Sequence, residues 1–172
     1  MHTHPGWFED PRDFDHVTRM RREKSCFDYK RPWMWCYSLN EQIEILEHGI
    51  DCLKRWGAGM PVAHRAGAYG LNKDTITALK KVGIPIDSSM FWGHTNCKEI
   101  WGKNQVIKKN DVMEIPVTGY FRDESLTIGP IKINRYKDRF VKTDIDSCSL
   151  KELIWFSDQI LLNENAIMNY FM

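Results

Sequence analysis

The sequence has no long hydrophobic run and no excess of charge of either sign. Its 172 residues carry 24 Lys and Arg against 23 Asp and Glu, a formal net charge of +1. A general nucleic-acid binder usually has a domain pI above about 9, so nucleic acid is not an expected partner. No apolar run approaches the roughly 18 residues of a transmembrane helix, and no transmembrane segment is predicted.

Cysteines are few and scattered, and none of the five belongs to a C-x-x-C pair. The spacing therefore suggests neither a structural zinc knuckle nor a thioredoxin-like motif. The first ten residues, MHTHPGWFED, lack the basic and apolar regions of a secretory signal peptide. Free thiols without an export signal favour a reducing compartment, so the sequence predicts a cytoplasmic protein.

Apolar and aromatic residues, in contrast, are plentiful, and 42% of the chain is hydrophobic. This content suits a single folded domain over residues 1–172. Both ends interrupt a pattern: chemically reactive residues open the chain, and the apolar stretch 166–172 ends it without a turn signal. We expect a domain truncated at both ends. The alternative is a complete small domain with an edge strand at its C-terminus.

Three helices are predicted where a capping residue precedes apolar residues at helical spacing. Their expected bounds are about 39–56, 73–82 and 150–163. The predicted caps are Ser38, Asn72 and Ser149.

Short apolar stretches between these helices are predicted strands, and alternation of strands with helices is typical of βα units with a parallel sheet. In such folds the chemistry lies at the carboxyl ends of the strands. His4, Arg65 and Asp87 all lie at or just after such ends. The strands are expected at 60–63, 84–86, 112–117 and 166–172.

Two histidines stand two residues apart at the start of the chain, His2 and His4. Side chains alternate along an extended segment, so both imidazoles are expected on one side of it. Two imidazoles on one side can share a metal ion, as in catalytic zinc sites with an open position. The pattern predicts a site for Zn²⁺ or another divalent metal, and it is equally compatible with two solvated histidines.

Residues 63–90, AHRAGAYGLNKDTITALKKVGIPIDSSM, resemble the polysaccharide deacetylase family (carbohydrate esterase family four, NodB-like). The family's H-x-H-P motif resembles residues 2–5, and its R-x-[GP]-x-Y type motif resembles residues 65–69. A third motif, Gly-hydrophobic-x-x-Asp, resembles residues 83–87. The family's opening acidic strand would precede residue 1, and its closing Leu-x-His strand would lie at or just past residue 172.

The resemblance implies an α/β fold, a partial distorted (β/α) barrel. It implies a metal-dependent hydrolase that removes acetyl groups from a polysaccharide or sugar conjugate, which is then the expected partner. In the family the second-motif arginine pairs with the catalytic base, and the third-motif aspartate orients an acid histidine. These catalytic roles fall on Arg65 and Asp87, and the metal-ligand roles fall on His2 and His4.

Substrate contacts are expected from four further residues. The backbone near Tyr69 resembles the family's oxyanion donor, and Gly67 permits close backbone approach. Trp7 and Trp92 are candidates for stacking on sugar rings, because each directly follows a site motif. Structural roles remain open for all of these, and His64 is expected to be a hydrogen-bonded wall residue.

Truncation would remove the catalytic base, one zinc ligand and the acid histidine. The chain is then expected to bind zinc weakly, to release little acetate, and to self-associate through an open barrel edge. Two alternatives stay open: a non-catalytic carbohydrate-binding protein that keeps the cleft, and a small-ureide amidohydrolase.

Overall fold

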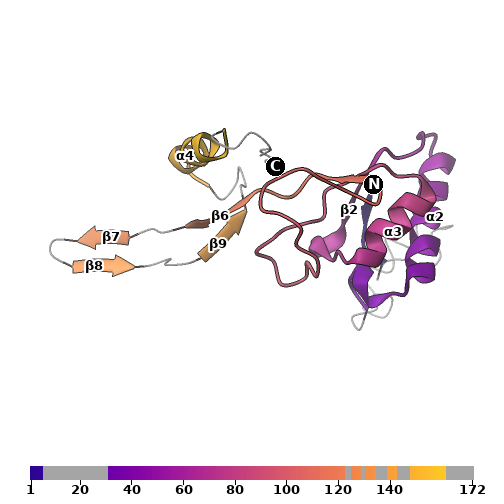
Figure 1. Ribbon diagram of the computed structural model, residues 1–172, viewed down its shortest axis with the longest axis horizontal. Coiled ribbons are helices and arrows are strands. Elements are labelled where there is room, and N and C mark those ends of the chain that lie inside the picture. Colours follow the sequence, from indigo (N-terminus) through magenta and orange to yellow (C-terminus); the bar gives the residue numbers. More distant parts are fainter. Residues whose placement is uncertain (6–30, 123–124, 129–130, 135–138, 143–147, 162–172) are drawn as a thin grey trace.

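The computed structural model describes residues 1–5, 31–122, 125–128, 131–134, 139–142 and 148–161. Its centre is a five-stranded open sheet with the order β1-β2-β3-β5-β4, in which all neighbours are parallel except β4 and β5. The predicted mixed α/β class with a mostly parallel sheet is confirmed, whereas closure into a barrel is not seen among the described strands (Figure 1). The strands are β1 (His2–Thr3), β2 (Ala63–Ala66), β3 (Ile86–Asp87), β4 (Ile107–Lys109) and β5 (Val112–Glu114).

The three predicted helices are confirmed in the described part of the chain. They are α2 (Leu39–Arg55), α3 (Lys73–Val82) and α4 (Leu150–Leu161), and a short 3-10 turn, η2 (Met34–Cys36), precedes α2. Ser38, a predicted cap, forms a capping box with Glu41, in which each side chain accepts a hydrogen bond from the other residue's backbone N–H. Gly83 ends α3 in the left-handed conformation, with φ +81°, which glycine adopts without steric cost.

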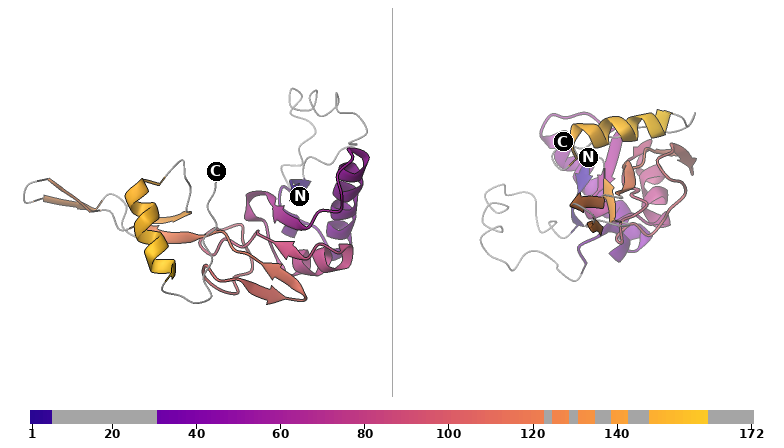
Figure 2. Two further views of the ribbon diagram at one scale, coloured as in Figure 1. Left: turned by 90° about the horizontal axis from the view of Figure 1, so that it is seen from above. Right: turned by 90° about the vertical axis from the view of Figure 1, so that its left-hand side faces the viewer.

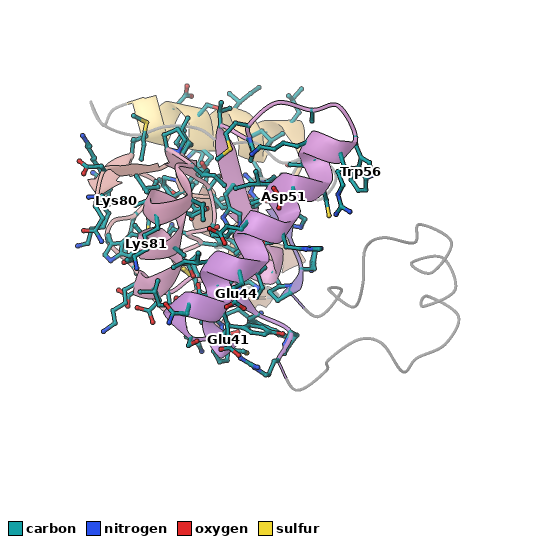
Figure 3. The ribbon with its side chains drawn as sticks, turned by 90° about the vertical axis from the view of Figure 1, so that its right-hand side faces the viewer. Glu41, Glu44, Asp51, Trp56, Lys80 and Lys81 are labelled. Atoms are coloured by element: carbon teal, nitrogen blue, oxygen red, sulfur yellow. The ribbon has the colours of Figure 1, made fainter. Side chains whose placement is uncertain are left out.

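Helices α2 and α3 cover one face of the sheet, and the hydrophobic core lies between them and the strands. Leu46 of α2 and Leu79 of α3 are fully buried in one cluster with Ala66 and Val112 of the sheet. Figure 3 shows the outer side of this layer, where α2 and α3 present charged side chains to solvent. Those labelled on the two helices include Glu44, Asp51, Lys80 and Lys81.

The predicted strands are displaced at their ends. The strand predicted at 60–63 begins at Ala63 and not at Met60, because the first residue of β3, Ile86, pairs with Ala63 and the Met1 amino group donates to Ala63 O. Regular pairing in β5 ends at Glu114, just before Pro116, which has no N–H to donate. The strand predicted at 166–172 lies outside the described residues.

Two antiparallel ribbons that the sequence pattern did not reveal lie beyond the sheet. Figure 1 and the left view of Figure 2 show them extending away from α2 and α3, with α4 beside the first. Asn104 anchors the first ribbon to the sheet region, since its side chain accepts from Gly119 N–H and donates to Gly119 O. The strands are β6 (Gly119–Arg122) with β9 (Arg139–Lys142), and β7 (Ser125–Ile128) with β8 (Ile131–Asn134).

Candidate functional site

Strand alternation divides the polar residues of the sheet between its two faces. Register pairs His64 with Asp87 and Asp87 with Glu114, so these three side chains share one face. His2 is paired with Arg65, one residue out of phase with His64, so this pair belongs to the opposite face. We call the first the buried face, since it lies under α2 and α3, and the second the open face.

On the open face the two histidines of the H-x-H motif meet. His2 Nε2 and His4 Nε2 lie 2.9 Å apart, and their rings are nearly perpendicular. His2 Nδ1 lies 3.0 Å from the carbonyl oxygen of Arg65, which can only accept, so the His2 proton belongs on Nδ1. Neutral His2 then accepts at Nε2, and His4 donates from its own Nε2.

Both imidazoles favour the neutral form. Burial lowers the pKa of His2, and the nearby His4 lowers it further. Burial also lowers the pKa of His4. At neutral pH both rings are therefore uncharged, which is the state that binds a metal ion.

Arg65 lies beside this pair, held by the end of β3. Its Nε donates to Ser88 O at 2.9 Å, and its Nη2 donates to Ser88 Oγ at 2.8 Å. Two hydrogen bonds from one planar guanidinium fix its orientation. The half-buried cation is thus directed along the open face.

The turn after β2 requires the glycine that the sequence pattern singled out. A Cβ at Gly67 would lie 2.5 Å from His4 Nδ1 and 2.7 Å from Thr3 O, so only glycine allows β1 to approach this closely. Ala68 and Tyr69 in the 3-10 turn η3 (Gly67–Tyr69) adopt positive φ values of 49° and 60°. The absence of a side chain at Gly67 therefore lets His4 lie directly against this turn.

Of the aromatic residues expected to contact a substrate, the structure describes Tyr69 and Trp92, and both contact other side chains of the protein. The ring of Tyr69 packs edge-on against Phe91 and His94, with centroid distances of 4.9 and 5.0 Å. Trp92 donates from Nε1 to Asn104 Oδ1, and Lys103 Nζ lies 4.8 Å from the centre of its ring. Trp92 thus belongs to the loop that anchors β6, and Trp7 lies outside the described residues.

The buried face holds a continuous row of polar side chains. Thr3 Oγ1 lies 2.8 Å from His64 Nε2, and His64 Nδ1 lies 2.7 Å from Asp87 Oδ1. Ser89 Oγ also donates to Asp87 Oδ1, at 2.7 Å, and Met90 N–H donates to Glu114 Oε1 at 2.9 Å. The expectation that His64 is hydrogen-bonded within a wall is met.

The catalytic roles that the resemblance assigns to Arg65 and Asp87 require both side chains to face one cleft, and the structure contradicts this requirement. Asp87 is fully buried and bonded to His64, whereas Arg65 is bonded to Ser88 on the other side of the sheet. Side chains alternate between the two faces along a strand. Asp87 is in register with His64, the residue before Arg65, so Asp87 and Arg65 lie on opposite faces. Asp87 does orient a histidine, but that histidine is the buried His64.

The two acidic groups of the buried face have opposite ionisation. Burial opposes ionisation of Asp87, but hydrogen bonds from His64 and Ser89 outweigh it, so the Asp87 pKa lies below its ordinary value. Burial raises the pKa of Glu114 to about 10, reinforced by the negative charge of Asp87. At neutral pH Asp87 is ionised and Glu114 is not.

Sequence reasoning missed Thr3, Ser89 and Glu114. One signal for Glu114 was present: it stands two residues after Val112 in an apolar stretch, the spacing that places both on the buried side. In the described part of the chain, no group of three or more His, Cys, Asp and Glu side chains could hold a metal ion.

No helix among the described residues is long and apolar enough to span a membrane. Comparisons of the chain find no matching protein-family model, no matching curated protein and no matching solved structure.

Proposed function

We propose that the open face is part of the metal site of a hydrolase that removes acetyl groups from a polysaccharide or sugar conjugate. The observation that carries the proposal is the convergence of His2 Nε2 and His4 Nε2, 2.9 Å apart, beside the immobilised Arg65. The reaction class comes from the resemblance of residues 63–90 to polysaccharide deacetylases. On the same ground we propose that the sheet is a segment of a distorted (β/α) barrel.

The residues of the open face fit a zinc ion in part. His2 and His4 would hold the ion through Nε2, and binding would require His4 to move its proton from Nε2 to Nδ1. Catalytic zinc sites use three protein ligands, so the proposal requires a third donor from outside the described residues. When bound, the ion would polarise the acyl carbonyl and lower the pKa of a bound water.

Arg65 supplies the fixed positive charge that this chemistry needs. Its guanidinium is half-buried and bonded twice to Ser88, so it is oriented before any substrate arrives. A preorganised cation stabilises a carboxylate base or a developing oxyanion without reorganising. Asp87, being fully buried, acts indirectly, through His64 and the strand that carries the two histidines.

Zinc binding tests the metal site directly. Calorimetric titration of the chain with Zn²⁺ at pH 7.5 is expected to show binding that the His2→Ala and His4→Ala variants each weaken at least tenfold. His48→Ala, which removes a histidine from α2, is the matched control and should leave the affinity unchanged. Equal zinc affinity in all four proteins would refute the assignment of these ligands.

Acetate release distinguishes a hydrolase from a binder. Zinc-dependent acetate release from an acetylated chito-oligosaccharide, lost in His2→Ala and in Arg65→Ala, would support the proposal. Because little acetate is expected from this chain, the deciding outcome is the effect of zinc on binding. Oligosaccharide binding that does not respond to zinc, and is unchanged in His2→Ala and His4→Ala, would overturn the proposal in favour of a non-catalytic carbohydrate-binding protein.

A further inference from the structure

The buried face contains a row of side chains that the proposed hydrolysis does not use. It runs across four neighbouring strands, from Thr3 on β1 through His64 on β2 and Asp87 on β3 to Glu114 on β5. All four residues are at most 2% exposed. A buried polar row is stable only when nearly every donor and acceptor in it is paired.

Two oxygen atoms in the row have no ordinary donor. Asp87 Oδ1 accepts from His64 and Ser89, and Glu114 Oε1 accepts from Met90 N–H. Asp87 Oδ2 and Glu114 Oε2 are both buried without a donor. The two carboxyl groups belong to register-paired residues and are close enough to hydrogen-bond to each other.

We propose that one proton is held between these carboxyl groups, carried by Glu114 and donated from its Oε2 to Oδ2 of Asp87. A single proton then satisfies both unpaired oxygens. Two ionised carboxylates on register-paired residues, away from water, would repel each other strongly. A neutral Glu114 removes that repulsion and leaves the negative charge on Asp87.

The retained charge on Asp87 orders the rest of the row. It accepts the proton of His64 Nδ1, which leaves His64 Nε2 as the acceptor for the Thr3 hydroxyl. Thr3 lies between His2 and His4, so the row fastens the strand that carries the open-face histidines. Glu114 is thus a positioning residue, acting from the opposite side of the sheet.

The groups around Glu114 are consistent with this arrangement. Asp87 and His64 share its face from β3 and β2, and the cation of Arg65 lies on the other side of the sheet. Cys97, in the loop after β3, is a further titratable neighbour, and burial raises the pKa of its thiol. The helix α3 contributes apolar side chains to this region, including Ile76 and Leu79.

The variant Glu114→Gln separates this proposal from a merely structural role. The Gln amide can donate to Asp87 Oδ2 and its carbonyl can accept from Met90 N–H, so it reproduces the neutral acid at the same size. Its amide does not titrate. Glu44→Gln on the exposed side of α2 is the matched control for the chemical change.

The test is the pH dependence of unfolding by urea. In the unfolded chain glutamate ionises near pH 4.3, whereas Glu114 in the folded protein keeps its proton up to about pH 10. The folded protein then holds one more proton than the unfolded chain throughout this window. The contribution of Glu114 to the free energy of unfolding is therefore fully present below about pH 4.3. It decreases as the pH rises toward about 10.

The folding equilibrium of the parent protein should therefore fall relative to that of Glu114→Gln, by close to tenfold per pH unit between pH 6 and 9. Glu44→Gln should follow the parent at every pH. An infrared band of a neutral carboxyl group at pH 8, present in the parent and absent from Glu114→Gln, is expected as well.

A second measurement follows the row itself. The imidazole nitrogen shifts of His64 should move as the pH approaches 10 in the parent and stay constant in Glu114→Gln, because Asp87 loses its partner only in the parent. The proposal is overturned if Glu114→Gln is destabilised equally at all pH values, or if no neutral carboxyl band exists at pH 8.

Discussion

The two faces of the five-stranded sheet carry similar side chains under opposite conditions. On the buried face His64 is enclosed by Asp87 and Thr3, and both of its ring nitrogens are engaged within the fold. On the open face His2 Nε2 and His4 Nε2 contact each other at the sheet edge formed by β1, and His2 Nδ1 also contacts the carbonyl oxygen of Arg65. A titratable residue under the helices must be satisfied by the protein itself, while one on the open face remains available for a ligand.

This difference implies different consequences of mutation. Loss of a partner on the buried face leaves a polar group that water cannot reach, and the cost appears as lost stability. Loss of a partner on the open face exposes the group to solvent, and the cost appears mainly in what the site can bind.

The largest expected effect is that of Asp87→Ala. The change leaves His64, Ser89 and the proton of Glu114 without their acceptor, which should lower the free energy of unfolding by about 3–5 kcal/mol. Ser88→Ala, one residue along on the open face, should cost about 1 kcal/mol or less, since Arg65 can turn to water. Urea unfolding measures both, and equal losses would contradict the contrast between the faces.

Two adjacent apolar residues of β5 also compare the buried face with the open face. Val112 is 1% exposed and faces α3, whereas Met113 is 43% exposed. Val112→Ala should lower the free energy of unfolding by about 2 kcal/mol through lost burial. Met113→Ala should change it by about 0.5 kcal/mol. A larger loss for Met113 in thermal or urea unfolding would mean that the open face is covered.

Close approach of β1 to the turn after β2 is tested by Gly67→Ala. The added methyl group would collide with His4 and Thr3 O, so the His2–His4 pair must move apart. Zinc affinity should fall about tenfold, the lower end of the effect of altering groups that orient metal ligands. Gly59→Ala is the control, because nothing lies within 4 Å of a Cβ at Gly59. Equal zinc affinity in both variants would show that the approach is not needed.

The smallest expected effect is the shift in histidine titration. Burial lowers the pKa of His2 and of His4, so both imidazole signals in NMR spectra should titrate below the ordinary midpoint of about pH 6.5. The stability that depends on the neutral rings is present above that pH and is lost as the pH falls through the lowered values. His4→Ala should move the His2 midpoint back upward, and an unchanged midpoint would rule out the coupling between the rings.

Local patterns were sufficient for much of this fold. The caps at Ser38 and Asn72 and the following apolar periodicity predicted α2 and α3 almost to the residue, because helix ends are decided by hydrogen bonds between near neighbours. The pairing of His2 with His4 was likewise predictable, since alternation along an extended chain is a local property.

The ribbons β6–β9 and β7–β8 were not predicted, since antiparallel pairing depends on register between separate segments. Local patterns also could not predict which residues of two neighbouring strands share a face of the sheet. Arg65 and Asp87 occupy the positions in the sequence that correspond to the family motifs. The register of β2 with β3 nevertheless places them on opposite faces of the sheet.

The sequence by itself determined where the helices form, that strands alternate with them, and that two histidines lie together at the start of the chain. Only the tertiary structure decided that Asp87 is enclosed with His64 and Glu114 while Arg65 remains on the open face. The physical reason is that the ionisation and role of a carboxyl group depend on burial and on charges brought near it by distant strands. Neither burial nor such neighbours can be obtained from the residues on either side of it in the chain.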